Sequence, residues 1–265
     1  MSNLSDTSQL DSVITSFQVD ALTVRLYNQE ARLTQDAAKI AQQYLQHLLT
    51  EQSTITVILA TGNSQIKFLE ALIALEGVDW SRSVLFHLDE YLGIEANHRA
   101  SFRHYLQERV EKQVNPAVFH YIQGDAMQPL AECERYTRLL QTQQIDLCCL
   151  GLGENGHLAF NEPSVVDFND PYPVKLVRLE LATRQQQVSE RHFPVLDAVP
   201  QYAFTLTIPL ICSAKKILCF APEKRKALAV KKMLQEPIST GSPASILRTQ
   251  NQATLFLDPD SASLL

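Results

Sequence analysis

Apolar runs of strand length alternate with helical segments along most of the chain, and this alternation limits the possible folds more than any other feature. We expect strands at 21–27, 55–60, 83–88, 118–122, 145–150, 174–181, 202–208, 216–221 and 254–257. Helices are expected at 30–50, 65–76, 99–113, 129–143, 183–191 and 224–235. Such a pattern is typical of a mostly parallel sheet with helices on both faces. The sequence therefore predicts an α/β fold: a flexible tail at 1–18, then one doubly wound, Rossmann-like domain at 19–265.

Composition narrows the functional classes. Of 265 residues, 45% are hydrophobic and 20% are charged, which is ordinary for a globular protein. The net charge of −6, without a basic block, argues against nucleic-acid binding, and no apolar run is long enough to span a membrane. Five cysteines without a Cys-x-x-Cys pair suit a reducing compartment. We expect a cytoplasmic protein that binds neither nucleic acid nor membrane.

The stretch from Gly151 to Pro163 follows the expected strand 145–150 and holds three of the chain's eight glycines within six residues. Its spacing, Gly-x-Gly-x-x-Gly, matches the dinucleotide-binding fingerprint, but Pro163 interrupts the long helix that such a turn should open. The alternative is a tight turn with an incidental histidine. The nearby polar residues His157, Asn161 and Glu162 favour a catalytic turn at the ligand-binding edge of the sheet.

The same stretch resembles the glucosamine-6-phosphate deaminase/isomerase family, whose glycine-rich turn continues as Gly-His-(Ile/Leu)-(Ala/Gly)-Phe-Asn-Glu-Pro. The related 6-phosphogluconolactonases share the Gly-His but continue differently. The resemblance implies that His157 opens the sugar ring, supported by a carboxylate, Glu162, and by a turn residue. That residue is Asp in many members and Asn155 here, which removes a negative charge beside the histidine. The resemblance implies neither a cofactor nor a metal.

Thr61, Gly62, Asn63 and Ser64 stand between an expected strand and an expected helix. Free amides and hydroxyls at a helix N-terminus can bind phosphate, although Asn63 or Ser64 would also serve as a simple helix cap. The family resemblance implies that this loop holds the sugar phosphate. It also implies that Lys226 and Arg191 are phosphate-binding cations, and that 164–191 forms a mobile lid.

Asp89 and Glu90 follow the expected strand 83–88. Neighbouring residues of an extended segment point to opposite sides, so only one of the two can face a given pocket. Both could also be solvated, but the resemblance implies that Asp89 is a catalytic base. His87 with Asp89 suggests a metal site, yet no third ligand has suitable spacing.

Taken together, these matches make the chain similar to the glucosamine-6-phosphate deaminases, and the resemblance implies conversion of glucosamine 6-phosphate and water to fructose 6-phosphate and ammonia. The expected partner is a small amino-sugar phosphate, and the chain could act as a monomer or a homo-oligomer. Three alternatives stay open: a 6-phosphogluconolactonase, a galactosamine-6-phosphate isomerase, and a regulator that binds sugar phosphate without turning it over. A segment at 205–209, Thr-Leu-Thr-Ile-Pro, resembles the lactonases more than the deaminases.

Overall fold

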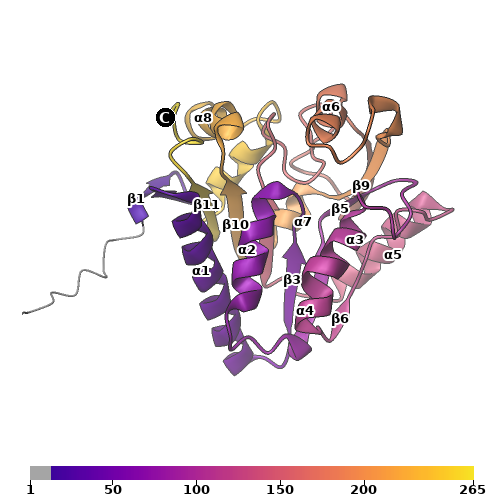
Figure 1. Cartoon of the computed structure of the whole chain (residues 1–265), viewed down its shortest axis with the longest axis horizontal. Coiled ribbons are helices and arrows are strands. Elements are labelled where there is room, and N and C mark those ends of the chain that lie inside the picture. The colour runs from indigo at the N-terminus through magenta and orange to yellow at the C-terminus, as the bar shows by residue number, and fades with distance from the viewer. Residues whose placement is uncertain (1–12) are drawn as a thin grey trace, which may run out of the picture.

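A computed structural model describes residues 13–265 of the chain. A sheet of eight strands forms the centre of the molecule, and Figure 1 shows its helices around it. The strand order is β1-β2-β11-β10-β7-β3-β4-β6. Every neighbouring pair is parallel except β1 with β2. The strands are β1 (Val13–Val19), β2 (Leu22–Tyr27), β3 (Ile55–Leu59), β4 (Ser83–His87), β6 (Val118–Phe119), β7 (Leu147–Gly151), β10 (Lys216–Ala221) and β11 (Ala253–Leu257). The predicted mostly parallel α/β fold is confirmed.

Helices cover both faces of this sheet because its central strands are apolar on both sides. One face packs against α1 (Glu30–Glu51), α2 (Asn63–Ala74) and the segment from α3 (Phe102–Leu106) to α4 (Lys112–Val114). The other packs against α5 (Pro129–Gln141), α7 (Ile208–Cys212) and α8 (Ala227–Gln235). Adjacent residues Cys148 and Cys149 of β7 belong to opposite cores, as alternation along a strand requires.

The predicted tail at 1–18 is too long, because β1 begins at Val13; residues 1–12 lie outside the described part of the chain. Asp20 adopts a left-handed conformation (φ 53°), which turns β1 back to pair antiparallel with β2. Phe17 and Val19 then pack against the core. β-branched and aromatic residues recur in this segment, as is typical of a β-strand, but its polar residues obscured this signal in the sequence.

A second sheet, which the sequence reading did not separate from the first, stands at the end of the molecule that carries α6 (Leu181–Ser189) (Figure 1). It has the order β5-β9-β8, all antiparallel, with β5 (Asp89–Tyr91), β9 (Tyr202–Leu206) and β8 (Val174–Arg178). Only Leu88 separates β4 from β5, so the chain passes directly from one sheet to the other. This crossing brings the residues after β4 together with the predicted lid segment.

The expected helix at 99–113 is also different in detail. It begins at Phe102 and contains a π-helical turn at Gln107–Glu111 before it ends at Val114. No helix in the described part of the chain is long and apolar enough to cross a membrane. All five cysteines have free thiols, and four of them are buried.

Candidate active site

A pocket lies where the winding of the sheet reverses. From β3 the chain continues to β4 on one side, whereas from β7 it continues to β10 on the other. In doubly wound sheets the carboxyl ends of two such strands leave a crevice that binds ligands. A pocket of about 120 Å³ occupies this position, and its walls come from the loops after β3, β4 and β7, from α6 and from the 3₁₀ turn Lys224–Lys226 that precedes α8.

The loop after β3 contributes all four residues predicted to hold phosphate, Thr61, Gly62, Asn63 and Ser64. Gly62 takes the N-cap position of α2 with φ 95°, a conformation that favours glycine. A glycine cap supplies no side chain to the helix, so the expected capping by Asn63 or Ser64 is not what the structure shows. The backbone N–H of Gln65 bonds to the carbonyl of Gly62 at 3.1 Å, whereas the first two amides of α2 belong to Asn63 and Ser64, which both line the pocket and have no intrahelical acceptor.

The glycines after β7 shape the turn that carries His157. A side chain at Gly153 would place its Cβ 2.4 Å from three atoms of the His157 ring, so only glycine fits beside the imidazole. Gly156 has φ 85° and bonds back to the carbonyl of Gly153 at 3.1 Å. Isolated bridges pair Leu158 with Leu152 and with Asn161, and no helix follows. This geometry excludes the dinucleotide-binding turn.

His157 lines the pocket and is held by Asn155. The Nδ1 atom of His157 lies 2.7 Å from Oδ1 of Asn155, which also accepts the backbone N–H of His157 at 3.2 Å. Burial, and then the charge of Lys226, lower the pKa of His157 to about 3, while Glu190 opposes this shift. The imidazole is therefore neutral near pH 7. An amide oxygen only accepts hydrogen bonds, so Nδ1 carries the proton and Nε2 keeps a free lone pair.

Asp89 and Glu90 face in different directions, as the alternation predicts. Asp89 lines the pocket and is only 7% exposed. Burial, and then the neighbouring charge of Glu90, raise the pKa of Asp89 well above its ordinary value. Glu90 instead accepts hydrogen bonds from Ser101 Oγ at 2.7 Å and from the backbone N–H of Arg103 at 2.9 Å, at the start of α3. Asp89 is thus a basic carboxylate at the pocket, and Glu90 supports the wall.

Glu162 lies beside the site but does not line the pocket. Its carboxylate accepts the backbone N–H of Glu180 at 2.7 Å and the hydroxyl of Thr183, both at the N-terminus of α6. Burial raises the pKa of Glu162, and these two hydrogen bonds oppose that shift. The predicted grouping of Glu162 with His157 is therefore indirect: the carboxylate anchors the helix that forms one wall, and only Thr183 of this set reaches the pocket.

The cations differ from the prediction in one respect. Lys226 lines the pocket, is 6% exposed and forms no ion pair within residues 13–265; burial, and then Arg225, lower its pKa. Arg191, by contrast, is exposed and does not line the pocket, and its backbone is left-handed (φ 62°). The arginine at the pocket is Arg225, which pairs with Glu154 at 3.1 Å, with Glu223 at 2.9 Å and with Glu190.

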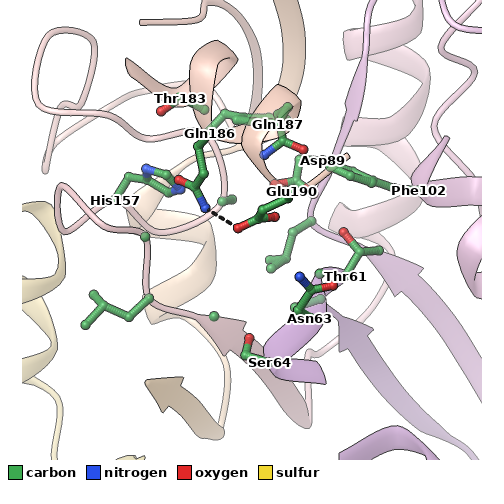
Figure 2. Close-up of a pocket in the computed structure, with 18 of the residues that line it drawn as sticks. Thr61, Asn63, Ser64, Asp89, Phe102, His157, Thr183, Gln186, Gln187 and Glu190 are labelled. Atoms are coloured by element: carbon green, nitrogen blue, oxygen red, sulfur yellow. Dashed lines mark hydrogen bonds between the residues drawn. The ribbon is translucent and has the colours of Figure 1, made fainter. Parts of the chain in front are cut away.

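Sequence reasoning missed the wall that α6 and its C-terminal end provide. Figure 2 shows the carboxylate of Glu190 projecting into the pocket, with Gln186 bonded to it at 2.8 Å. The other lining residues with polar or aromatic side chains that were missed are Phe102, Thr183, Gln187, His192 and Arg225. The available signal was the scarcity of apolar residues in 183–191, because a helix packed against the protein through polar side chains often faces a ligand site. Within residues 13–265, no three His, Cys, Asp or Glu side chains are grouped as metal ligands.

Comparison with known proteins agrees with this arrangement. Residues 28–256 match the sequence pattern of the family described as glucosamine-6-phosphate isomerases/6-phosphogluconolactonase. A glucosamine-6-phosphate deaminase of Exiguobacterium sibiricum is 34% identical over 232 residues, covering 87% of this chain and 90% of the relative. One of Listeria monocytogenes is 32% identical over 228 residues, covering 86% and 95%.

Solved structures give the same result. A monomeric glucosamine-6-phosphate deaminase superposes with a TM-score of 0.84 at 32% identity, covering 91% of this chain and 99% of that one. A 6-phosphogluconolactonase from Thermotoga maritima shares the fold, with a TM-score of 0.72 at 20% identity and coverage of 89% and 99%. The chain therefore belongs to the glucosamine-6-phosphate isomerase/6-phosphogluconolactonase family.

Proposed function

We propose that this protein is a glucosamine-6-phosphate deaminase, which converts D-glucosamine 6-phosphate and water to D-fructose 6-phosphate and ammonia. One arrangement carries the proposal: a neutral histidine and a buried carboxylate, His157 and Asp89, line the same pocket as the N-terminus of α2 and Lys226, which has no ion pair among residues 13–265. The relatives at 32–34% identity that carry this name support the same substrate class.

The phosphate group fits the end of the pocket formed by the Thr61–Ser64 loop and Lys226. The amides at the start of α2 and the hydroxyls of Thr61 and Ser64 can donate hydrogen bonds to phosphate oxygens. The buried ammonium of Lys226 would supply the positive charge, and a phosphate dianion would offset the cost of burying it.

Ring opening falls to His157. Its Nε2 lone pair can take the proton of the anomeric hydroxyl, and the same nitrogen can then return a proton to the ring oxygen. A neutral imidazole is needed for this step, and burial provides it. The product is the open-chain aldehyde.

Proton abstraction follows at C-2, where the aldehyde delocalises the charge that develops. Asp89 would take the C-2 proton and return a proton to C-1, which leaves an imine that water hydrolyses to the ketone and ammonia. The raised pKa of Asp89 makes it a stronger base than an ordinary carboxylate once it has ionised. Glu162 would contribute by fixing α6 against this site.

The segment 164–191 would act as the lid. In the structure Glu190, not Arg191, occupies the pocket side of its C-terminal end, and Glu190 is bound to Arg225. A phosphate that displaced Glu190 from Arg225 would allow the end of α6 to rearrange and bring Arg191 inward.

Three substrate assays and one binding measurement test the proposal. Ammonia and fructose 6-phosphate should form from glucosamine 6-phosphate. Galactosamine 6-phosphate measures the sugar preference, and acid release from 6-phosphogluconolactone measures lactonase activity. Lactone hydrolysis without ammonia from any amino-sugar phosphate would contradict the proposal. Binding of these sugars without any turnover would indicate a regulator instead.

A further inference from the structure

A carboxylate outside the pocket is joined to His157 through one intervening side chain. Glu180 Oε2 accepts a hydrogen bond from Nδ2 of Asn155 at 3.2 Å. Its other oxygen, Oε1, accepts the backbone N–H of Ser164 at 3.2 Å. Asn155 in turn lies 2.7 Å from Nδ1 of His157 through its amide oxygen. The three side chains form a line from half-buried Glu180 to the imidazole.

The order of atoms along this line determines which nitrogen of His157 is protonated. An ionised carboxylate only accepts hydrogen bonds, so the amide nitrogen of Asn155 must face Glu180. The amide oxygen then faces His157 and requires a proton on Nδ1. If the amide turned over, its nitrogen would donate to Nδ1, the imidazole proton would move to Nε2, and the nitrogen that faces the sugar would lose its lone pair.

We propose that Glu180 is a positioning residue, which fixes the amide of Asn155 and thereby keeps His157 in the tautomer that can accept a proton from the sugar. The proposal rests on the proposed function for its catalytic consequence, but its structural content is the tautomer itself. The backbone N–H of His157 holds the same amide oxygen at 3.2 Å, so Asn155 is fixed from both ends.

The position of Glu180 also links the tautomer of His157 to the position of α6. Glu180 occupies the N-cap position of the helix, and its backbone N–H is bound to Glu162. Thr183, in the first turn, is bound to the same carboxylate and lines the pocket. The helix that forms one pocket wall therefore carries Glu180, which fixes the tautomer of His157. His157 is held in the tautomer that accepts a proton only when α6 is in place.

The first test replaces the carboxylate with its neutral isostere. Glu180→Gln has one acceptor oxygen in place of two, so it cannot accept from both Asn155 and Ser164. We expect kcat to fall by about 10- to 150-fold, the range that the loss of a hydrogen bond to a charged group gives. KM should stay nearly unchanged because the phosphate loop is untouched. Arg178→Gln, an exposed change in charge at the end of β8, is the control and should retain wild-type kinetics.

Nuclear magnetic resonance of protein labelled with ¹⁵N-histidine reports the tautomer without relying on activity. Wild type should show a protonated Nδ1 and an unprotonated Nε2 at His157, assigned by loss of the signal in His157→Gln. Glu180→Gln should shift both nitrogens toward a mixture of tautomers. A wild-type spectrum with the proton on Nε2 would overturn the proposal, even if the variant does not fold. Absence of deaminase activity in a protein with the expected spectrum would contradict the proposed function alone.

A double replacement tests whether Glu180 positions the Asn155 amide or only supports α6. Asn155→Asp alone places a carboxylate against Glu180 and should lower kcat. In the Glu180→Gln background the same change should raise kcat, because the Gln amide can donate to Asp at 155 and the proton on Nδ1 is restored. If Glu180 only supported α6 and did not control the tautomer, Asn155→Asp would change kcat in the same direction in both backgrounds. That result would refute the inference.

Discussion

Removing the amine of Lys226 gives a quantitative test of where phosphate binds. The side chain lines the pocket, is 6% exposed and has no ion-pair partner in the described residues, so its positive charge is available to a ligand. Hydrogen bonds to charged groups contribute about 1.5–3 kcal/mol. Loss of such a bond corresponds to about 10- to 150-fold in affinity, at 1.36 kcal/mol for each factor of ten.

The assay compares glucosamine 6-phosphate with glucosamine, which lacks the phosphate. Lys226→Ala should lower kcat/KM for the phosphorylated sugar by this factor, mainly through KM, and should leave the slow reaction of glucosamine within about twofold. Lys224→Ala is the matched control, because Lys224 belongs to the same 3₁₀ turn (Lys224–Lys226) but is exposed and does not line the pocket.

Equal losses on both sugars would show that Lys226 maintains the pocket and does not recognise phosphate. A collapse of kcat at unchanged KM would refute the assignment as well. In either case the phosphate would be bound by the Thr61–Ser64 loop alone or by Arg225.

Two further predictions follow from the charges in the pocket. Burial raises the pKa of Asp89, so the folded state binds the carboxyl proton more tightly than the unfolded chain does, and the protein loses stability as the pH rises above about 4. Asp89→Asn should therefore have a higher melting temperature than wild type at pH 7–8 but not at pH 4. If the variant and wild type had equal melting temperatures at both pH values, the shift would be contradicted. Glu190 is paired with Arg225 inside the pocket, where its carboxylate would repel the substrate phosphate. Glu190→Gln should therefore lower the KM for glucosamine 6-phosphate, by about tenfold for each 1.4 kcal/mol of this repulsion that is removed. A higher KM would indicate that Glu190 contacts the sugar.

The sheet could be predicted because its strands carry their own signal. Residues 216–221 form β10 with the predicted bounds, since a strand buried on both faces reads as an unbroken apolar run. Alternation along an extended segment also predicted that only one of Asp89 and Glu90 faces the pocket, and Asp89 is the one that lines it. These predictions depend only on neighbours in the chain.

The small sheet and the lid-side wall could not be predicted in the same way. Asp89 pairs with Thr205, and nothing near either residue indicates that the chain leaves one sheet for the other at Leu88. Glu180 reaches Asn155 across 25 residues, and its role depends on where α6 docks. The family resemblance assigns phosphate binding to Arg191, but it does not determine the backbone conformation that leaves this side chain exposed.

Exchange of the C-2 hydrogen of glucosamine 6-phosphate with deuterated water tests the central claim most directly, because it follows the proposed proton transfer at Asp89 itself. Wild type should introduce deuterium at C-2 of recovered substrate or at C-1 of fructose 6-phosphate. Loss of a positioned general base costs about 10²- to 10⁴-fold, so Asp89→Asn should exchange slower by that factor while phosphate affinity stays near wild type. Exchange by Asp89→Asn at the wild-type rate would show that another group removes the proton, and the proposed mechanism would be wrong.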